Sequence, residues 1–256
     1  MHCWEADILD FALGRATTRV MTELKHALIV AHGQPSEPEP AEAALAALAA
    51  RVNANASHIA IRSATLASPG RLEEILDDLP DGTPVYPLFT AKGWFVTRAL
   101  PRRIGGRACP VMEPLGIDPE LPDAVAEYLT SELAARQWEA TATELVLAAH
   151  GSGRSQNPAE VAHGFADELQ SRIGFARLTV GFVEQPPSIA EAAQGCGEQS
   201  LCLPFFACAG GHVQDDVPQA LAEARFPGDT LPVLGDLPAV TRLIARRISE
   251  FSDAAT

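Results

Sequence analysis

The chain lacks the long apolar segments and the excess of basic residues that identify membrane and nucleic-acid-binding proteins. No apolar run approaches the roughly 18 residues that a membrane-spanning helix needs, and residues 1–25 lack the charged start and apolar centre of a signal peptide. The net charge of −14 argues against binding to a phosphate backbone, which requires basic patches. We therefore expect a cytoplasmic protein with neither a membrane nor a nucleic-acid partner.

Paired cysteines are also missing. The five cysteines are an odd number and include no Cys-x-x-Cys pair, which argues against a disulfide framework and against a structural zinc site. Cys208 lies four residues before His212 and could be a soft metal ligand, although a small buried hydrophobic residue is the more frequent role of such a cysteine. Hydrophobic residues make up 47% of the chain, which is enough for packed cores.

A pattern that occurs twice divides the 256 residues into two halves. Residues 27–33 are Ala-Leu-Ile-Val-Ala-His-Gly and residues 145–151 are Leu-Val-Leu-Ala-Ala-His-Gly. A repeat of this length indicates a duplicated domain, with about 120 residues for each copy, and not a solenoid of short units. Matched segments containing proline follow downstream, at 84–89 and 201–206 and at 108–112 and 230–234.

Apolar periodicity and turn residues predict the same alternation of strands and helices in both halves. The expected strands are 26–31, 58–62, 84–89 and 108–112, then 144–149, 177–183, 200–206 and 230–234. The expected helices are 41–52, 70–79, 96–104 and 120–136, then 158–173, 187–195, 214–225 and 238–251, with 35–40 as a loop. Such alternation indicates an α/β fold of two tandem lobes, each a four-stranded parallel sheet flanked by helices. We expect a helical extension over residues 1–25, a first lobe over 26–137 and a second lobe over 143–256.

Three side chains with metal-ligand chemistry follow successive strands of the second lobe. His150 and Glu184 end the first two strands, and His212 follows the third. Because the carboxyl ends of parallel strands lie at one edge of a sheet, these side chains can converge there. Two neutral imidazoles and a carboxylate suit a divalent ion such as Co²⁺, Ni²⁺, Fe²⁺ or Zn²⁺. One such histidine alone is more often a hydrogen-bonded loop residue, so only the coincidence of all three predicts a metal or acid–base site.

At these residues the chain resembles the CbiX family of class II chelatases, the sirohydrochlorin cobaltochelatases and ferrochelatases. The resemblance is strong over residues 144–251 and weaker over 26–136. It implies a cleft that holds a metal ion and a tetrapyrrole, with His150, Glu184 and His212 as the catalytic and metal-binding residues. The segments that carry it are 145–152, 181–189 and 203–213, followed by the acidic pair Asp215 and Asp216.

The resemblance implies a lyase that inserts Co²⁺ or Fe²⁺, with Ni²⁺ as a third option, into sirohydrochlorin or a related tetrapyrrole of siroheme or cobalamin biosynthesis. The metal is then a substrate, and no organic cofactor is expected. One alternative is a non-catalytic carrier of metal or tetrapyrrole on the same fold. Another is a small hydrolase that uses Ser152 and His150, although residues 151–153 lack the Gly-x-Ser-x-Gly spacing.

Other polar residues near the three strand ends allow two interpretations each. Ser152, Arg154 and the backbone N–H groups of residues 151–153 could bind substrate carboxylates, because a loop that leads into a helix favours anions; Arg154 could equally be a surface residue. Asp215 and Asp216 could attract cations, or they could be present because acidic residues stabilise the first turn of a helix.

The first lobe departs from the family pattern. His32 is present, but Phe95 aligns with His212, and no glutamate follows the strand that ends near residues 63–65. One ligand of three is too few for a metal site, so this lobe is expected to be a degenerate structural partner that could form one wall of the cleft. Trp94 and Phe95 could stack on the macrocycle or be ordinary core aromatics. With its cleft formed internally, the chain is expected to be a monomer with an internal pseudo-dimer, or a weak homodimer.

Overall fold

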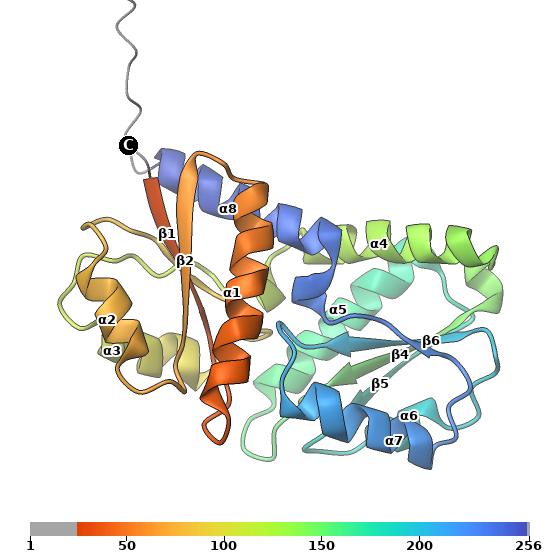
Figure 1. Cartoon of the computed structure of the whole chain (residues 1–256). Helices are drawn as coiled ribbons and strands as arrows, with labels where there is room; N and C mark the ends of the chain where they lie inside the picture. The colour runs from red at the N-terminus through yellow and green to blue at the C-terminus, as the bar shows by residue number, and fades with distance from the viewer. Residues whose placement is uncertain (1–24, 255–256) are drawn as a thin grey trace, which may run out of the picture.

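The computed structural model describes residues 25–254 and contains two parallel sheets flanked by helices (Figure 1). This confirms the predicted fold class, while the predicted helical extension lies outside the described residues apart from Lys25, which begins the first strand. The first sheet has the order β2-β1-β3 and consists of β1 (Lys25–Ala31), β2 (Ile59–Thr65) and β3 (Val85–Pro87). The second has the order β5-β4-β6-β7 and consists of β4 (Glu144–Ala149), β5 (Arg177–Phe182), β6 (Ser200–Phe205) and β7 (Asp229–Thr230).

The helices follow the same order in both lobes. The first lobe has α1 (Pro38–Ala54), α2 (Arg71–Asp77), the π-helical turn η1 (Phe95–Ala99), α3 (Leu100–Ile104), η2 (Leu115–Ile117) and α4 (Leu121–Arg136). The second has α5 (Asn157–Ile173), α6 (Ile189–Ala193), the π-helical turn η4 (His212–Asp216), α7 (Val217–Glu223), η5 (Leu234–Asp236) and α8 (Pro238–Ala254). The short turn η3 (Ala140–Ala142) lies between the lobes.

The predicted strand 230–234 is shorter in the structure, where β7 shares only Thr230 with it. Two further differences involve proline. Residues 108–112 do not form a fourth strand in the first lobe, because their pairing is limited to a single bridge between Val85 and Val111. The neighbouring Pro110 has no N–H to donate to a ladder. The second difference is that α1 begins at Pro38, within the predicted loop. Proline is tolerated in a first helical turn, where N–H groups have no partner inside the helix.

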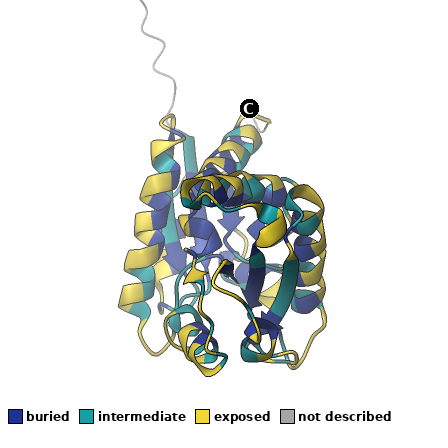
Figure 2. Ribbon diagram, turned by 90° about the vertical axis from the view of Figure 1, so that its right-hand side faces the viewer, coloured by how far each residue is buried: buried dark blue, intermediate teal, exposed yellow. Residues whose placement is uncertain are grey.

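The strands at the centre of each sheet are buried on both faces, and alternate side chains enter two different cores. In β1, Leu28 and Val30 pack with α2 and α3, and in β4, Val146 and Ala148 pack with α6 and α7. The residues between them enter one large core that contains side chains from both lobes. Figure 2 shows the strands dark blue at the centre and the outer helix faces yellow. In residues 25–254, no helix combines the length and the apolar composition needed to cross a bilayer.

Two helices join the lobes. The helix α4 ends the first half of the sequence but packs against α5 and α8, whereas α8 ends the chain and packs against α1 (Figure 1). An ion pair of 2.8 Å between Lys25 Nζ and Asp253 Oδ1 ties the end of α8 to the start of β1. The shared core and this helix packing hold the two sheets in a fixed arrangement. The division of the sequence at residues 137–143 stays a prediction.

Candidate functional site

Two of the three predicted site residues lie in direct contact. His150 follows β4 and His212 begins η4, and their Nε2 atoms are 3.1 Å apart with the rings nearly perpendicular, at 88°. Both side chains are half-buried, with 39% and 43% of their surface exposed, so each can reach solvent. The ends of β4 and β6 are neighbours in the sheet, which is why residues so far apart in sequence meet here.

The hydrogen bonds of the other ring nitrogens determine how the two imidazoles face each other. His150 Nδ1 lies 3.0 Å from the carbonyl oxygen of Gly151, which can only accept, so Nδ1–H donates. His212 Nδ1 lies 2.6 Å from Asp216 Oδ2, and it donates to this carboxylate. In the neutral rings, both Nε2 lone pairs then point at the 3.1 Å gap. Two lone pairs at this distance repel, so a cation or a proton between them is favoured.

The size of the gap fits a divalent transition metal. Two imidazole nitrogens that each bind such an ion at about 2.0–2.1 Å, with an angle of about 90–110° between the bonds, are separated by about 2.9–3.4 Å. The separation between His150 Nε2 and His212 Nε2 is 3.1 Å. The pair therefore can bind one ion with little side-chain movement and with open positions for water or a second ligand.

Glu184 lies on the other side of His150. Its Oε2 is 3.9 Å from His150 Nδ1, whereas the gap to His212 is at Nε2, and its side chain is exposed. No group of three or more histidine, cysteine, aspartate or glutamate side chains within the described part of the chain is arranged to hold a metal ion. The preformed part of the site is thus the pair of Nε2 atoms, and the Glu184 carboxylate lies nearer the Nδ1 side of the His150 ring. That Glu184 is a direct ligand stays a prediction.

Asp216 has a role that the sequence analysis missed. The π-helical turn η4 places Asp216 four residues after His212, and its carboxylate accepts the hydrogen bond that orients the imidazole. Such a partner holds the ring in place and makes the other nitrogen a better ligand. The signal was the spacing of four residues between His212 and Asp216, but the predicted helix began only at residue 214 and the sequence offered a helix-dipole explanation for the same acid.

The loop that follows His150 is held by the neighbouring strand. Gly151 has a φ of +70°, and a Cβ built there would lie 2.8 Å from Gln185 Cγ, so the turn requires glycine. Ser152 N–H donates to Gln185 Oε1 at 2.8 Å. The Ser152 hydroxyl accepts from Arg154 N–H, and among residues 25–254 no histidine nitrogen bonds to it. A serine hydrolase needs a base bonded to its nucleophile, so this geometry disfavours the hydrolase alternative.

The first lobe repeats the backbone of this site with different side chains. His32 Nδ1–H donates to the carbonyl of Gly33 at 2.7 Å, as His150 does to that of Gly151. Phe95 is the first residue of η1, and its ring packs on the His32 ring with a centroid distance of 4.2 Å and an interplanar angle of 81°. The backbone N–H of Ala67 donates to the carbonyl of His32, as that of Glu184 donates to the carbonyl of His150. Ala67 therefore has the position in the first lobe that Glu184 has in the second. His32 thus has a phenyl ring where His150 has a second imidazole.

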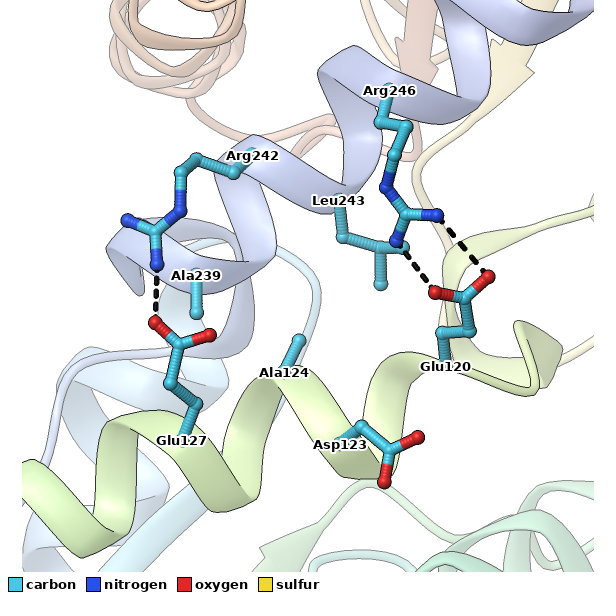
Figure 3. A pocket seen from close by; sticks show the side chains of 8 residues that line it. All are labelled: Glu120, Asp123, Ala124, Glu127, Ala239, Arg242, Leu243 and Arg246. Atoms are coloured by element: carbon cyan, nitrogen blue, oxygen red, sulfur yellow. Dashed lines mark hydrogen bonds and ion pairs between the residues drawn. The ribbon is translucent and has the colours of Figure 1, made fainter.

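Within the described residues Cys208 does not form a metal-binding group with the two histidines, and neither surface groove is lined by them. Burial, with a smaller contribution from Asp236, raises the pKa of the Cys208 thiol to about 11, so it is not a thiolate ligand near neutral pH. A groove of about 450 Å³ lies between α4 and α8 and is crossed by ion pairs of Arg242 with Glu127 and of Arg246 with Glu120 (Figure 3). A second groove, of about 480 Å³, lies between α5 and β5.

Comparison with known proteins relates the sequence and fold of this chain to one family. Residues 144–251 match the family model of CbiX. The solved structure of CbiX, the terminal enzyme for biosynthesis of siroheme in denitrifying bacteria, is 42% identical over 88% of this chain and 99% of that chain, with a TM-score of 0.79. No curated protein matches the chain in sequence.

Two more distant structures share the fold. DR2241 from Deinococcus radiodurans, a multi-domain protein with structural similarity to chelatases and two additional novel domains, is 22% identical with a TM-score of 0.67 over 87% of this chain. The match covers 54% of DR2241, so this chain spans about half of its length. SirB from Bacillus subtilis, solved with Fe³⁺, is 18% identical with a TM-score of 0.67 over 89% of this chain and 96% of SirB.

Proposed function

This chain belongs to the CbiX family, and on that premise we propose that it is a chelatase that inserts a divalent metal ion into a tetrapyrrole. The observation that carries the proposal is the pair of Nε2 atoms of His150 and His212, 3.1 Å apart in the lobe that matches the family. The substrate we propose is sirohydrochlorin, and the metal is Fe²⁺ or Co²⁺, with Ni²⁺ as a third option. The siroheme enzyme among the relatives favours testing Fe²⁺ first, since siroheme contains iron.

The geometry suggests how the residues act. Metal insertion releases two pyrrole protons, and it requires that the ion be bound loosely enough to leave its first ligands. As the ion passes to the macrocycle, the Nε2 lone pairs of His150 and His212 become free and can accept those protons. The Glu184 carboxylate lies 3.9 Å from His150 Nδ1, where its charge favours the protonated ring; we propose that it also relays a proton from that ring to solvent after a small side-chain movement. Asp216 stabilises the charge that forms on His212.

The distribution of arginines supports a substrate with many carboxylates. Of the 17 Lys and Arg side chains in residues 25–254, 13 form ion pairs. Arg154 is exposed on the loop after His150, and Arg98 is exposed on η1 after Phe95. Guanidinium groups bind carboxylates well, so these two unpaired side chains are available to bind carboxylates of the substrate. Within the described residues, the arginines outside ion pairs are Arg98, Arg102, Arg154 and Arg225.

The aromatic side chains of the first lobe offer a flat surface for the macrocycle. Trp94 is 60% exposed and Phe95 is 37% exposed, which is unusual for large apolar side chains. Their rings touch at a centroid distance of 5.3 Å, and Phe95 also stacks on Phe89 at 6.2 Å. Phe95 packs on His32, which is near Gln34, and Gln34 in turn contacts the second lobe beside His212. We infer that this cluster forms the wall of the cleft opposite the histidine pair.

Replacing Trp94 with alanine is expected to raise KM for the tetrapyrrole by about tenfold. The loss of one aromatic contact costs on the order of 1–2 kcal/mol. KM for the metal is expected to stay within about twofold of wild type, because Trp94 does not touch the histidine pair. The matched control is Trp94→Phe, which keeps a flat ring and is expected to retain most of the affinity. Equal KM values for Trp94→Ala and wild type would rule out this wall.

The proposed function is tested by incubating the protein anaerobically with sirohydrochlorin and Fe²⁺, Co²⁺ or Ni²⁺ in separate reactions, followed by absorbance. The chelatase is supported if each protein molecule forms many molecules of metallated tetrapyrrole, at a rate above that of the reaction without protein. Stoichiometric binding without turnover would instead support the carrier alternative. If neither is seen and simple esters are cleaved, the hydrolase alternative is correct and the proposal is wrong.

A further inference from the structure

A side chain of the first lobe contacts the loop that carries His212. Gln34 lies in the loop after β1, and its Oε1 accepts a hydrogen bond from the backbone N–H of Gly211 at 2.9 Å. Gly211 immediately precedes His212 at the start of η4, where N–H groups have no acceptor inside the helix. A Cβ built on Gly211 would lie 3.0 Å from both amide atoms of Gln34, so the two residues are in close contact.

The loop of His150 is held in the same manner, but from within its own lobe. Gln185 Oε1 accepts a hydrogen bond from Ser152 N–H at 2.8 Å. Each of the two histidine loops is therefore fixed by the side-chain carbonyl of one glutamine. Gln34 is two residues after His32, which is the position that Ser152 has after His150. The lobe with one ligand of the three thus contributes a contact that the second lobe does not supply for His212.

We propose that Gln34 is a positioning residue for the metal-insertion reaction: it fixes the start of η4 and thereby the place of His212 Nε2 relative to His150 Nε2. The inference rests on the proposed function for its effect on catalysis. Metal–ligand bond lengths stay within about 0.2 Å of their usual values, so both nitrogens must be at the right distance from the ion. A shift of the Gly211 backbone moves His212 directly, because the two are adjacent in the chain. The first lobe therefore completes the metal-binding geometry without supplying a ligand.

The contact itself can be tested without metal or substrate, by hydrogen–deuterium exchange of the full chain. Gln34→Leu removes the acceptor and keeps a side chain of similar size. It is expected to raise the exchange rate of the Gly211 amide by about three- to tenfold, the effect of losing one hydrogen bond. Gln34→Glu keeps an acceptor oxygen at the same reach and is expected to restore protection. Unchanged exchange of Gly211 in Gln34→Leu would overturn the proposal.

The consequence for the site is tested by titrating the same proteins with Co²⁺ and following its visible absorption. Gln34→Leu is expected to weaken Co²⁺ binding by about three- to tenfold and to raise KM for the metal more than it lowers kcat. Gln34→Glu is expected to bind Co²⁺ at least as well as wild type. The matched control is Arg51→Ala, which removes an ion pair with Asp236 that also joins the lobes but lies elsewhere.

Each outcome decides a distinct point. If Gln34→Leu binds Co²⁺ as wild type does, or if Arg51→Ala weakens binding equally, Gln34 only helps to pack the lobes together and the inference is wrong. If wild type itself binds no Co²⁺ and His212→Ala changes nothing, the proposed metal site fails. The exchange of the Gly211 amide then decides by itself whether Gln34 positions the start of η4.

Discussion

Replacing His150 or His212 with alanine is expected to lower the rate of metal insertion by at least about 100-fold. Each substitution removes one of the two nitrogens that face the 3.1 Å gap, together with a group that can accept a pyrrole proton. Initial rates should be measured at fixed metal and tetrapyrrole concentrations. Because both side chains are partly solvated, the midpoint of thermal unfolding is expected to change little.

The matched control for this prediction is His32→Ala. His32 has the same loop, the same Nδ1 hydrogen bond to the next carbonyl and the same position after the first strand of its lobe. Its partner is Phe95, which supplies no lone pair, so we expect the variant to retain most of the activity. A His32→Ala variant as inactive as His212→Ala would show that the first lobe is catalytic and that the asymmetric assignment is wrong.

Removing the carboxylate of Asp216 is expected to weaken metal binding by about 10- to 100-fold. The hydrogen bond of 2.6 Å from His212 Nδ1 sets the orientation of the ring and increases the electron density at Nε2, and partners of this kind contribute about that much to metal affinity. The measurement is a Co²⁺ titration of Asp216→Ala. Asp216→Asn keeps an acceptor oxygen without the charge, and an intermediate affinity is expected.

The control for Asp216 lies beside it. Asp215 is an exposed carboxylate in the same turn, and it makes no contact with His212 among the hydrogen bonds and ion pairs of the described residues. If Asp216 acts by attracting the cation through its charge alone, Asp215→Ala should weaken Co²⁺ binding to a similar degree. Equal effects of the two substitutions would contradict the orienting role that we assign to Asp216.

Much of the fold follows from the sequence, because the patterns that determine it are local. The continuous apolar runs that end at His32 and His150 indicate strands that are buried on both faces. The number of residues between successive strands indicates crossover helices. The same reasoning placed His150, Glu184 and His212 at one edge of the second sheet. It also aligned Phe95 with His212, and the structure places both residues at the start of a π-helical turn.

The tertiary structure decided which atoms face each other. The predicted strand ends place both Glu184 and His212 beside His150, whereas the structure shows His212 at Nε2 of that ring and Glu184 nearer Nδ1. The contact of Gln34 with Gly211 joins residues 177 positions apart and exists because the shared core and the exchanged packing of α4 and α8 fix one lobe against the other. Periodicity is a property of neighbouring residues, so it can place a ligand at a strand end, whereas the atoms that a ligand meets depend on packing between distant segments.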